Sequence, residues 1–226
     1  MSNDEWTRGK IERWIDQRSW YQRIELSNGL ITSGKIDCKA RLALLKTAVI
    51  RDRSVLDIGC NSGYYCLWAK KQGAAKVVGV DIDANRIEEG RTLAEIEGLD
   101  IEFNVKQMSE LMELGQFDVV FCFAVLTEIP DLLGSLNILK NVIGAKAYIE
   151  LALAKPLFYF SRSPFWLKSF LKKKYSRGIL EIRPSKKGWM MSPCLEVVRQ
   201  VLGKDFKVSF VGKGPRYDMI RVERIR

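Results

Sequence analysis

The stretch Val55 to Tyr65, VLDIGCNSGYY, places an apolar run directly before a loop that contains two glycines. The run VLDIG is typical of a buried strand, and the residues YYCLWAKKQG that begin at Tyr64 are typical of a helix. Gly59 and Gly63 therefore lie in a loop at the carboxyl end of a strand, where ligands bind in open α/β sheets. A glycine lacks a β-carbon, so the backbone can turn sharply there and a ligand can approach closely.

Outward from this loop, apolar β-branched runs alternate with helical patterns. The predicted strands are RSVLDIG, KVVGVD, IEFNVK, FDVVFCF and AYIELAL. The predicted helices are YYCLWAKKQG, ANRIEEGRTLAEIEG, SELMEL and DLLGSLNILKNVIG, several of which end in glycine as helices often do. This alternation predicts an α/β fold with a parallel sheet and helices on both faces.

The end of the chain has a different pattern. The run SPCLEVVRQVLG predicts a helix with Ser192 as its N-cap and Pro193 in its first turn. The strand-like runs FKVSFVG and RYDMIRVERI follow it and flank KGP. This pair predicts an antiparallel hairpin added to the parallel sheet.

Composition excludes several classes of protein. With 226 residues, 47% of them apolar, the chain can bury the core of one domain or of one domain plus an appendage. It contains no histidine, and its cysteines form no C-x-x-C pair, so no metal site is predicted. Acid-base chemistry must then use carboxylates, Lys, Tyr, Cys or the substrate. The net charge of +10 favours encounters with partners that carry phosphate or carboxylate groups.

The beginning of the chain and its apolar runs bear on location. The first ten residues, MSNDEWTRGK, lack the apolar region of a secretory signal. Charged residues interrupt every apolar run before it reaches the roughly 18 residues of a membrane span. The five cysteines are most simply read as reduced, buried thiols. We therefore expect a soluble, cytoplasmic protein.

Asp57 decides between classes of ligand for the glycine-containing loop. The spacing D-x-G-x-x-x-G differs from the G-x-G-x-x-G of dinucleotide-binding proteins, and no G-K-[ST] triphosphate motif follows. A carboxylate at the end of the strand would repel a polyphosphate. It suits a cationic ligand.

These residues resemble motif I of the class I S-adenosylmethionine-dependent methyltransferases, whose loop wraps the methionine part of the cofactor. Asp81 ends the next strand in VVGVDID, where that family binds the ribose hydroxyls. The resemblance implies a Rossmann-like, mostly parallel seven-stranded sheet with an antiparallel C-terminal strand, and S-adenosylmethionine as cofactor. The implied cofactor-binding residues are Asp57, Gly59, Cys60, Asn61, Gly63, Asp81, Ile82, Gln107, Met108 and Phe123.

A narrower resemblance covers most of the chain from about Trp20 onward, apart from the basic segment between Lys155 and Lys187. LDIGCNSGYY, AYIELAL, GWMMSP and GPRYDMIRVER are similar to the tRNA wobble-uridine carboxymethyltransferase family and its shorter relatives. That family uses a carboxylated form of S-adenosylmethionine and reads V-L-Y-H-R after its fourth strand. This chain has Thr127 and Glu128 at the corresponding positions. An acidic group there should repel a carboxylated cofactor, so we expect ordinary S-adenosylmethionine.

Carboxylates are the candidate bases. Glu150 interrupts the apolar strand AYIELAL, and we rank it first as a catalytic residue; pairing with a Lys or Arg of the basic segment is an equally good explanation. Glu128 is the second catalytic candidate, whereas Asp131 is expected to begin a helix. The candidate substrate-binding residues are Arg183, Arg216 and Tyr217.

The domain prediction has three parts. Residues 1–52, with a hairpin turn at SNG, form a cover over the cofactor site, and residues 53–226 form the methyltransferase domain. Residues 155–190 form a basic, lid-like insertion. Two alternatives stay open for it: residues 163–187 lie on an anionic membrane surface, or its basic residues contact RNA phosphates.

The function predicted from these observations is transfer of a methyl group from S-adenosylmethionine to an O or N of a small-molecule or glycan acceptor. One alternative is a methyl- or carboxymethyltransferase that acts on the wobble uridine of tRNA. Another is a binding protein that has kept the fold without catalysis.

Overall fold

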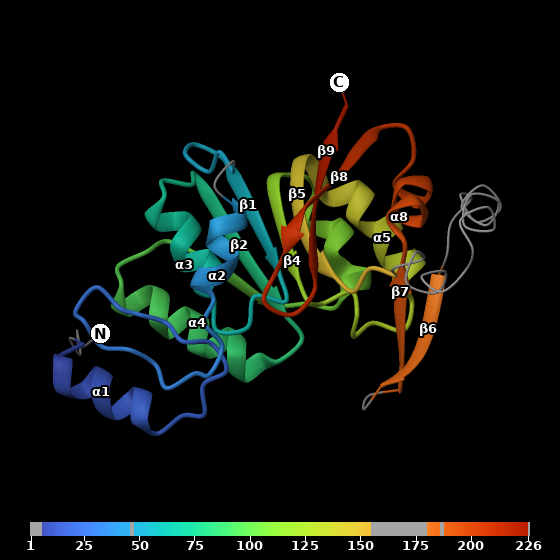
Figure 1. Cartoon of the computed structure of the whole chain (residues 1–226). Helices are drawn as coiled ribbons and strands as arrows, with labels where there is room; N and C mark the ends of the chain where they lie inside the picture. Colours follow the sequence, from blue (N-terminus) through green and yellow to red (C-terminus); the bar gives the residue numbers. More distant parts are fainter. Residues whose placement is uncertain (1–5, 46–47, 155–179, 186–187, 226) are drawn as a thin grey trace, which may run out of the picture. The chain divides into compact units, whose positions relative to one another are not determined.

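The computed structural model describes residues 6–45, 48–154, 180–185 and 188–225 (Figure 1). The chain divides into two compact units, residues 1–107 and residues 108–226. The division predicted from the sequence, a cover of residues 1–52 and a methyltransferase domain of residues 53–226, stays a prediction.

The seven-stranded sheet has the strand order β3-β2-β1-β4-β5-β9-β8. The pairs β1 with β2, β2 with β3 and β4 with β5 are parallel, whereas β9 is antiparallel to both β5 and β8. The predicted Rossmann-like fold, with a mostly parallel sheet and one antiparallel C-terminal strand, is confirmed. The seven strands are β1 Ser54–Ile58, β2 Lys76–Asp81, β3 Glu102–Val105, β4 Phe117–Phe123, β5 Ile143–Leu151, β8 Phe206–Lys213 and β9 Asp218–Arg224.

The first unit packs helices α3, Tyr64–Lys71, and α4, Ala84–Ile96, against strands β1 to β3. The middle of the unit is organised around the ring of Phe103 on β3, which is 3% exposed. A β-carbon added at Gly63, Gly79 or Gly90 would lie 2.6, 2.9 or 2.7 Å from that ring. These glycines leave room for one large aromatic side chain in the core.

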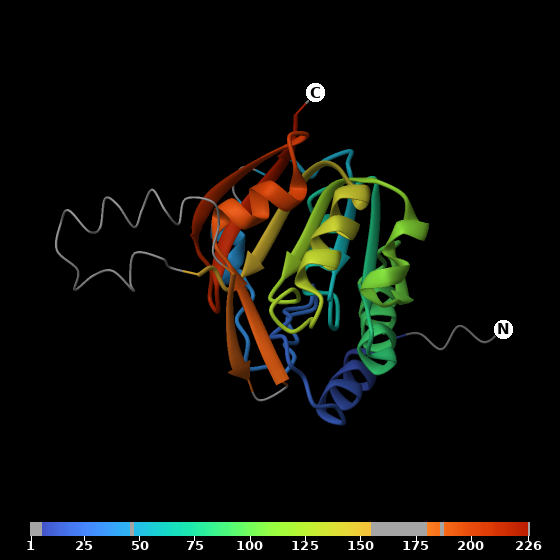
Figure 2. The same cartoon turned by 90° about the vertical axis from the view of Figure 1, so that its right-hand side faces the viewer.

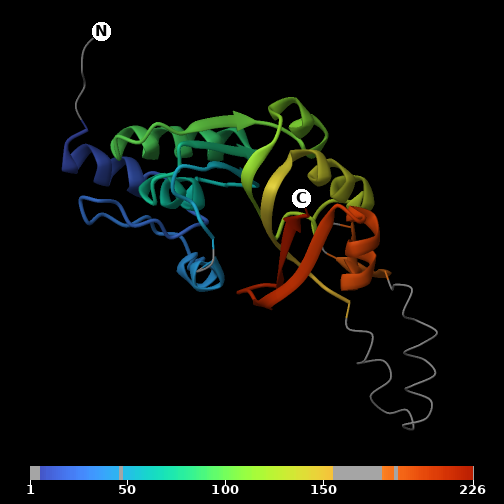
Figure 3. The same cartoon turned by 90° about the horizontal axis from the view of Figure 1, so that it is seen from above.

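The N-terminal part of the first unit contains α1, Arg8–Asp16, the short helix α2, Lys39–Leu42, and the 3-10 helix η1, Ala43–Leu45. The predicted turn at SNG is present: Leu26 N–H donates to Leu30 O at 2.8 Å, beside a single antiparallel bridge between Glu25 and Ile31. The segment between α1 and α2 passes beside α3 (Figure 3).

The second unit contains β4, β5, β8 and β9, with helices α5, Leu132–Val142, and α8, Leu195–Leu202. The two helices pack against each other, α5 against β5 and α8 against β8 (Figure 2). Asp131 is the N-cap of α5 and accepts a hydrogen bond from Gly134 N–H, so its predicted place at a helix start is confirmed.

The run SELMEL lies in a helix as predicted, and this helix is a 3-10 helix, η2, Met108–Leu114. One predicted helix feature in the second unit is wrong, because helix α5 does not end in glycine. Its C-cap is Ile143, which is also the first residue of β5, so the chain passes from helix to strand without a loop.

The predicted cap of the last helix is also wrong. Cys194 is the N-cap of α8, while Ser192 and Pro193 belong to strand β7, Gly188–Pro193. Strand β7 pairs with β6, Leu180–Ser185, in a separate two-stranded antiparallel sheet. In this pairing Ser192 lies opposite Glu181, so the serine belongs to a strand and does not cap a helix.

Most of the predicted basic insertion, residues 155–179 and 186–187, lies outside the described residues, and so does most of the segment 163–187 proposed for a membrane surface. Within the described residues, no helix is both long enough and apolar enough to cross a bilayer. The same part of the chain holds no group of three or more Cys, Asp or Glu residues arranged to bind a metal ion.

Candidate active site

The loop after β1 is built by backbone geometry that few residues adopt. Gly59, Asn61 and Gly63 have φ angles of +70°, +52° and +86°. The N–H groups of Gly59 and Cys60 both donate to Val80 O on β2, at 2.8 and 3.0 Å. Left-handed geometry at a non-glycine residue such as Asn61 persists only where the surroundings hold it, and it is frequent at functional sites.

Asp81, at the carboxyl end of β2, holds this loop from the neighbouring strand. Its Oδ2 accepts a hydrogen bond from Asn61 N–H at 2.9 Å, and its Oδ1 accepts one from Asp83 N–H at 3.0 Å. Asp83, and not Asp81, is the N-cap of α4 and accepts from Asn85 N–H. A carboxylate has about four acceptor positions, so Asp81 keeps acceptor capacity for hydroxyl groups of a ligand.

Asp57 lies beneath the loop and is 1% exposed. The Cys66 thiol donates to its Oδ2 at 3.5 Å. Burial raises the pKa of the Asp57 carboxyl to about 7; the hydrogen bond from Cys66 opposes this shift, and the charge of Asp81 adds to it. Near neutral pH this group therefore exists in both protonation states, and a neighbouring cation would favour the ionised one.

A further carboxylate that the sequence did not reveal fixes the loop from α4. Ser62 is fully buried, and its Oγ donates to Glu89 Oε2 at 2.6 Å. Glu89 is 8% exposed and pairs with Arg86 at 2.9 Å. The sequence offers no local signal for this contact, because Ser62 and Glu89 are 27 residues apart and meet only when α4 packs beside the loop.

The remaining predicted cofactor residues of the first unit differ in exposure. Cys60 is buried at 1%, whereas Ile82, directly after Asp81, is 74% exposed, which is unusual for a large apolar side chain. Gln107 is exposed. The exposed apolar surface of Ile82 is available to an apolar face of a ligand.

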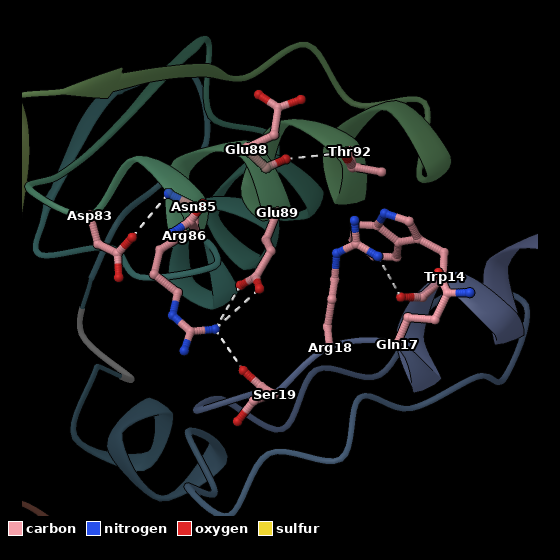
Figure 4. A pocket seen from close by; sticks show the side chains of 10 residues that line it. All are labelled: Trp14, Gln17, Arg18, Ser19, Asp83, Asn85, Arg86, Glu88, Glu89 and Thr92. Atoms are coloured by element: carbon pink, nitrogen blue, oxygen red, sulfur yellow. Dashed lines mark hydrogen bonds and ion pairs between the residues drawn. The ribbon is translucent and has the colours of Figure 1, made fainter.

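A pocket of about 510 Å³ lies in the same unit between α1 and the first turns of α4 (Figure 4). The Arg18 guanidinium lies 4.2 Å from the centre of the Trp14 ring, and Arg86 donates to Ser19 O at 2.8 Å. None of the predicted cofactor residues lines it. Its lining residues are Trp14, Gln17, Arg18, Ser19, Asp83, Asn85, Arg86, Glu88, Glu89 and Thr92.

In the second unit, β4 ends at Phe123 and is followed by Ala124 with a φ angle of +60°. Ala124 N–H donates to Glu150 O at 3.0 Å, which ties the end of β4 to the end of β5. Thr127 is buried, and Glu128 is exposed in the turn that follows. The exposed carboxylate of Glu128 can meet a ligand or solvent.

Glu150 is fully buried near the end of β5. Its Oε1 accepts hydrogen bonds from the N–H groups of Arg216 and Tyr217, at 3.2 and 3.3 Å. A β-carbon at Gly214 would collide with the same oxygen. The carboxylate thus binds the backbone of the turn between β8 and β9.

This turn carries two of the predicted substrate-binding residues. The Arg216 side chain is exposed, with its guanidinium carbon 5.8 Å from the centre of the Tyr217 ring. The third, Arg183, lies in β6 opposite Met190 of β7. Met108 begins the 3-10 helix η2 and is partly exposed.

Comparison with known proteins identifies part of the chain. Residues 55–143 match a family described as a methyltransferase domain. The ribosomal protein L11 methyltransferase of Neisseria gonorrhoeae is 36% identical over 116 residues, which are 47% of this chain and 38% of that protein. The enzyme of the same name from Methylobacillus flagellatus is 43% identical over 79 residues, 35% of this chain and 26% of that protein. The chain thus spans less than two fifths of the length of these relatives.

Solved structures match more of the chain. The N-terminal domain of EvdMO1, crystallised in the presence of S-adenosylhomocysteine and D-fucose, covers 100% of both chains with a TM-score of 0.73 and 14% identity. Magnesium protoporphyrin IX methyltransferase from Synechocystis PCC 6803, with bound S-adenosylmethionine, covers 81% of this chain and 76% of that chain, with a TM-score of 0.56 and 17% identity. At these identities the likeness concerns the fold.

Residues 55–143 thus match a methyltransferase domain, and solved structures that share the fold were crystallised with S-adenosylmethionine or S-adenosylhomocysteine, in agreement with the predicted cofactor. The narrower likeness to the tRNA wobble-uridine family stays a prediction. The family match begins at the first residue of VLDIGCNSGYY and extends through β2 and Asp81 to the start of β5. The chain therefore has the Rossmann-like fold of these solved structures, and its residues 55–143 match a methyltransferase domain.

Proposed function

We propose that the chain transfers the methyl group of S-adenosylmethionine to an O or N atom of a small-molecule or glycan acceptor in the cytoplasm. The main support for S-adenosylmethionine as cofactor is the arrangement of residues around the β1 loop. Asp81 accepts a hydrogen bond from Asn61 in this loop, and Asp57 is buried under it. The acceptor part draws support from the whole-length likeness to a domain that was crystallised with a sugar.

The residues of the first unit fit this cofactor. Asp57 is a carboxyl group that becomes anionic most readily beside a cation, as an amino group or a sulfonium would require. Asp81 keeps acceptor positions that two ribose hydroxyls can use. Ile82 offers an exposed apolar surface for a planar base. When bound, the cofactor supplies an electrophilic methyl group and its own leaving group.

The protein then has to position the acceptor and remove its proton. Glu128 is exposed after β4 and can accept that proton, so we assign it the role of base. Glu150 is engaged with two backbone N–H groups, which supports a positioning role for the turn that carries Arg216 and Tyr217. Arg216 would bind an anionic or hydroxyl-rich acceptor from this turn.

A protein or tRNA acceptor has less support. The likeness to the ribosomal protein L11 methyltransferases covers 47% of this chain and 38% of the relative from Neisseria gonorrhoeae, so most of that relative has no counterpart in the alignment. For tRNA, the acidic Glu128 replaces a basic position of the resembled family and would repel a carboxylated cofactor. A protein that had lost the cofactor would have no use for a buried carboxyl at Asp57, which is costly to keep ionised.

A thermal-shift experiment tests the cofactor site. At about 100 times its dissociation constant, S-adenosylmethionine should add roughly 2.7 kcal/mol and raise Tm by about 5 to 10 °C. We expect Asp81→Ala to remove this shift, because it deletes both the ribose acceptor and the contact with Asn61.

The matched control is Asp83→Ala, which removes the N-cap of α4 and should lower Tm while it keeps the ligand shift. The carboxylated cofactor, tested in parallel, should produce a much smaller shift. A larger shift with the carboxylated form would contradict the proposal and make tRNA the first acceptor to test. Binding without methyl transfer to any member of an acceptor screen would indicate a non-catalytic protein.

A further inference from the structure

The side chain of Gln22, in the segment between α1 and α2, is joined to both ends of the β1 loop. Its Nε2 donates to Cys60 O at 3.2 Å, and its Oε1 accepts from Tyr64 N–H at 3.2 Å. Gln22 is 5% exposed. One buried amide therefore spans the loop that is proposed to bind the methionine part of the cofactor.

Helix α3 needs this partner at its beginning. Its N-cap is Gly63, which has no side chain to accept a hydrogen bond from the first N–H groups of the helix. Gln22 supplies the acceptor for Tyr64 N–H from a position 42 residues earlier in the chain. The helix start and the loop geometry thus depend on the N-terminal segment.

Gln22 is itself held in place by that segment. Thr32 Oγ1 donates to Gln22 O at 2.7 Å, and Ile24 N–H donates to Thr32 Oγ1 at 2.8 Å. The backbone of Gly34 lies so close to Gln22 O that a β-carbon there would collide with it. The amide is therefore presented by a packed structure.

We propose that Gln22 is a positioning residue for the cofactor site, through which the order of the N-terminal segment and the binding of cofactor are coupled. The inference rests on the proposed placement of the cofactor at the β1 loop. A loop held in its binding geometry binds more tightly, because less conformational entropy is lost on binding. By reciprocity, bound cofactor stabilises the link and slows opening of the segment.

The test uses the full chain, with S-adenosylhomocysteine as the probe in isothermal titration. Gln22→Met keeps the length and packing of the side chain but removes both hydrogen bonds, and we expect it to weaken binding by about tenfold. Gln22→Glu keeps the acceptor for Tyr64 N–H but loses the donor to Cys60 O, so it should also bind more weakly than the wild type.

The matched control is Ser27→Ala. It loosens the same segment at another attachment, where Ser27 Oγ donates to Glu97 Oε2 at 2.6 Å, without contacting the loop. This variant should keep its affinity for S-adenosylhomocysteine within about twofold.

Amide hydrogen exchange separates positioning from a merely structural role. In the wild type, S-adenosylhomocysteine should slow amide hydrogen exchange at Tyr64 in the helix and at Thr32 and Ile36 in the segment. The amides of Thr32 and Ile36 donate hydrogen bonds to Ile24 O and Tyr21 O, respectively. In the Gln22→Met variant, S-adenosylhomocysteine should slow amide hydrogen exchange only within the β1 loop. Unchanged affinity and protection in that variant, or an equal loss of affinity in Ser27→Ala, would overturn the inference. If the wild type binds no S-adenosylhomocysteine, the proposed cofactor site itself fails.

Discussion

Replacing Asp57 by Asn is expected to stabilise the fold at pH 8 and to weaken the binding of S-adenosylmethionine. In the folded chain the Asp57 carboxyl has a pKa raised by burial from 3.8 to about 7. Above that pH the wild type must keep an ionised carboxylate at 1% exposure, whereas Asn is neutral and keeps an oxygen for the Cys66 thiol. The variant thus gains stability and loses the anion that we propose faces the cofactor.

The sign of the pH dependence follows from proton linkage. The folded state holds the proton up to about pH 7, whereas the unfolded chain releases it near pH 3.8. Folding therefore binds a proton between these values, so the contribution of Asp57 to stability is full below pH 4 and falls until about pH 7. The difference between the pKa values of Asp57 in the folded and unfolded chain corresponds to about 4 kcal/mol of folding free energy. Denaturant titrations at pH 5, 6, 7 and 8 should show this decline in the wild type and its absence in Asp57→Asn.

Binding should change in the opposite direction. A charge-assisted hydrogen bond contributes about 1.5 to 3 kcal/mol, so Asp57→Asn should weaken S-adenosylmethionine roughly 10- to 100-fold at pH 8. Asp100→Asn, at an exposed carboxylate of the same unit, is the control and should change neither quantity. An Asp57→Asn protein that is less stable than the wild type at pH 8 would contradict the burial argument. An unchanged affinity of Asp57→Asn for S-adenosylmethionine would show that Asp57 does not contribute to the cofactor site.

Substitutions at Glu150 should separate its positioning role from the role of a base. Glu150→Ala leaves the N–H groups of Arg216 and Tyr217 without their acceptor in a buried site, which should cost about 3 kcal/mol. Glu150→Gln keeps an oxygen at that place and should cost less than about 1 kcal/mol. In methyl-transfer assays with an acceptor from the screen, Glu150→Gln should keep kcat within about threefold, because a positioning residue needs only the acceptor oxygen.

Glu128→Gln is the companion variant. If Glu128 is the base, its loss should lower kcat by roughly 100-fold or more, with a small change in KM. The opposite pattern, a large loss of kcat in Glu150→Gln with KM unchanged, would make Glu150 the base, as its position in an apolar strand first indicated. Unfolding measured on the same samples shows whether any loss of rate reflects loss of fold.

The sequence revealed the features that depend on local pattern. The strands β1 to β5, the hairpin of β8 and β9, and the helix start at Asp131 all follow from periodicity and from residues that prefer helix starts. The position of Asp81 beside the loop could be predicted too, because the ends of adjacent parallel strands meet at one edge of a sheet.

The sequence did not reveal contacts between distant segments. Nothing near Gln22 indicates that its side chain reaches Cys60 and Tyr64, since that contact exists only once the N-terminal segment has folded beside α3. The role of Glu89 is hidden for the same reason. The cap at Ser192 was misassigned because the local signal for a helix start competed with pairing of β7 to β6, and the tertiary pairing prevailed.

Because of the packing around Phe103, the second glycine of the motif does not by itself show that a related protein still binds the cofactor. A chain that lost its cofactor through evolution would still need Gly63, because a β-carbon there would meet the aromatic ring in the core. Selection for folding alone would preserve that glycine in an inactive descendant. Asp57, by contrast, lowers the folding stability of the chain at neutral pH. Once cofactor binding was no longer under selection, mutations that replace this residue would be favoured. Retention of the buried acid, rather than of the glycine, is therefore the better marker of surviving activity among relatives of this chain.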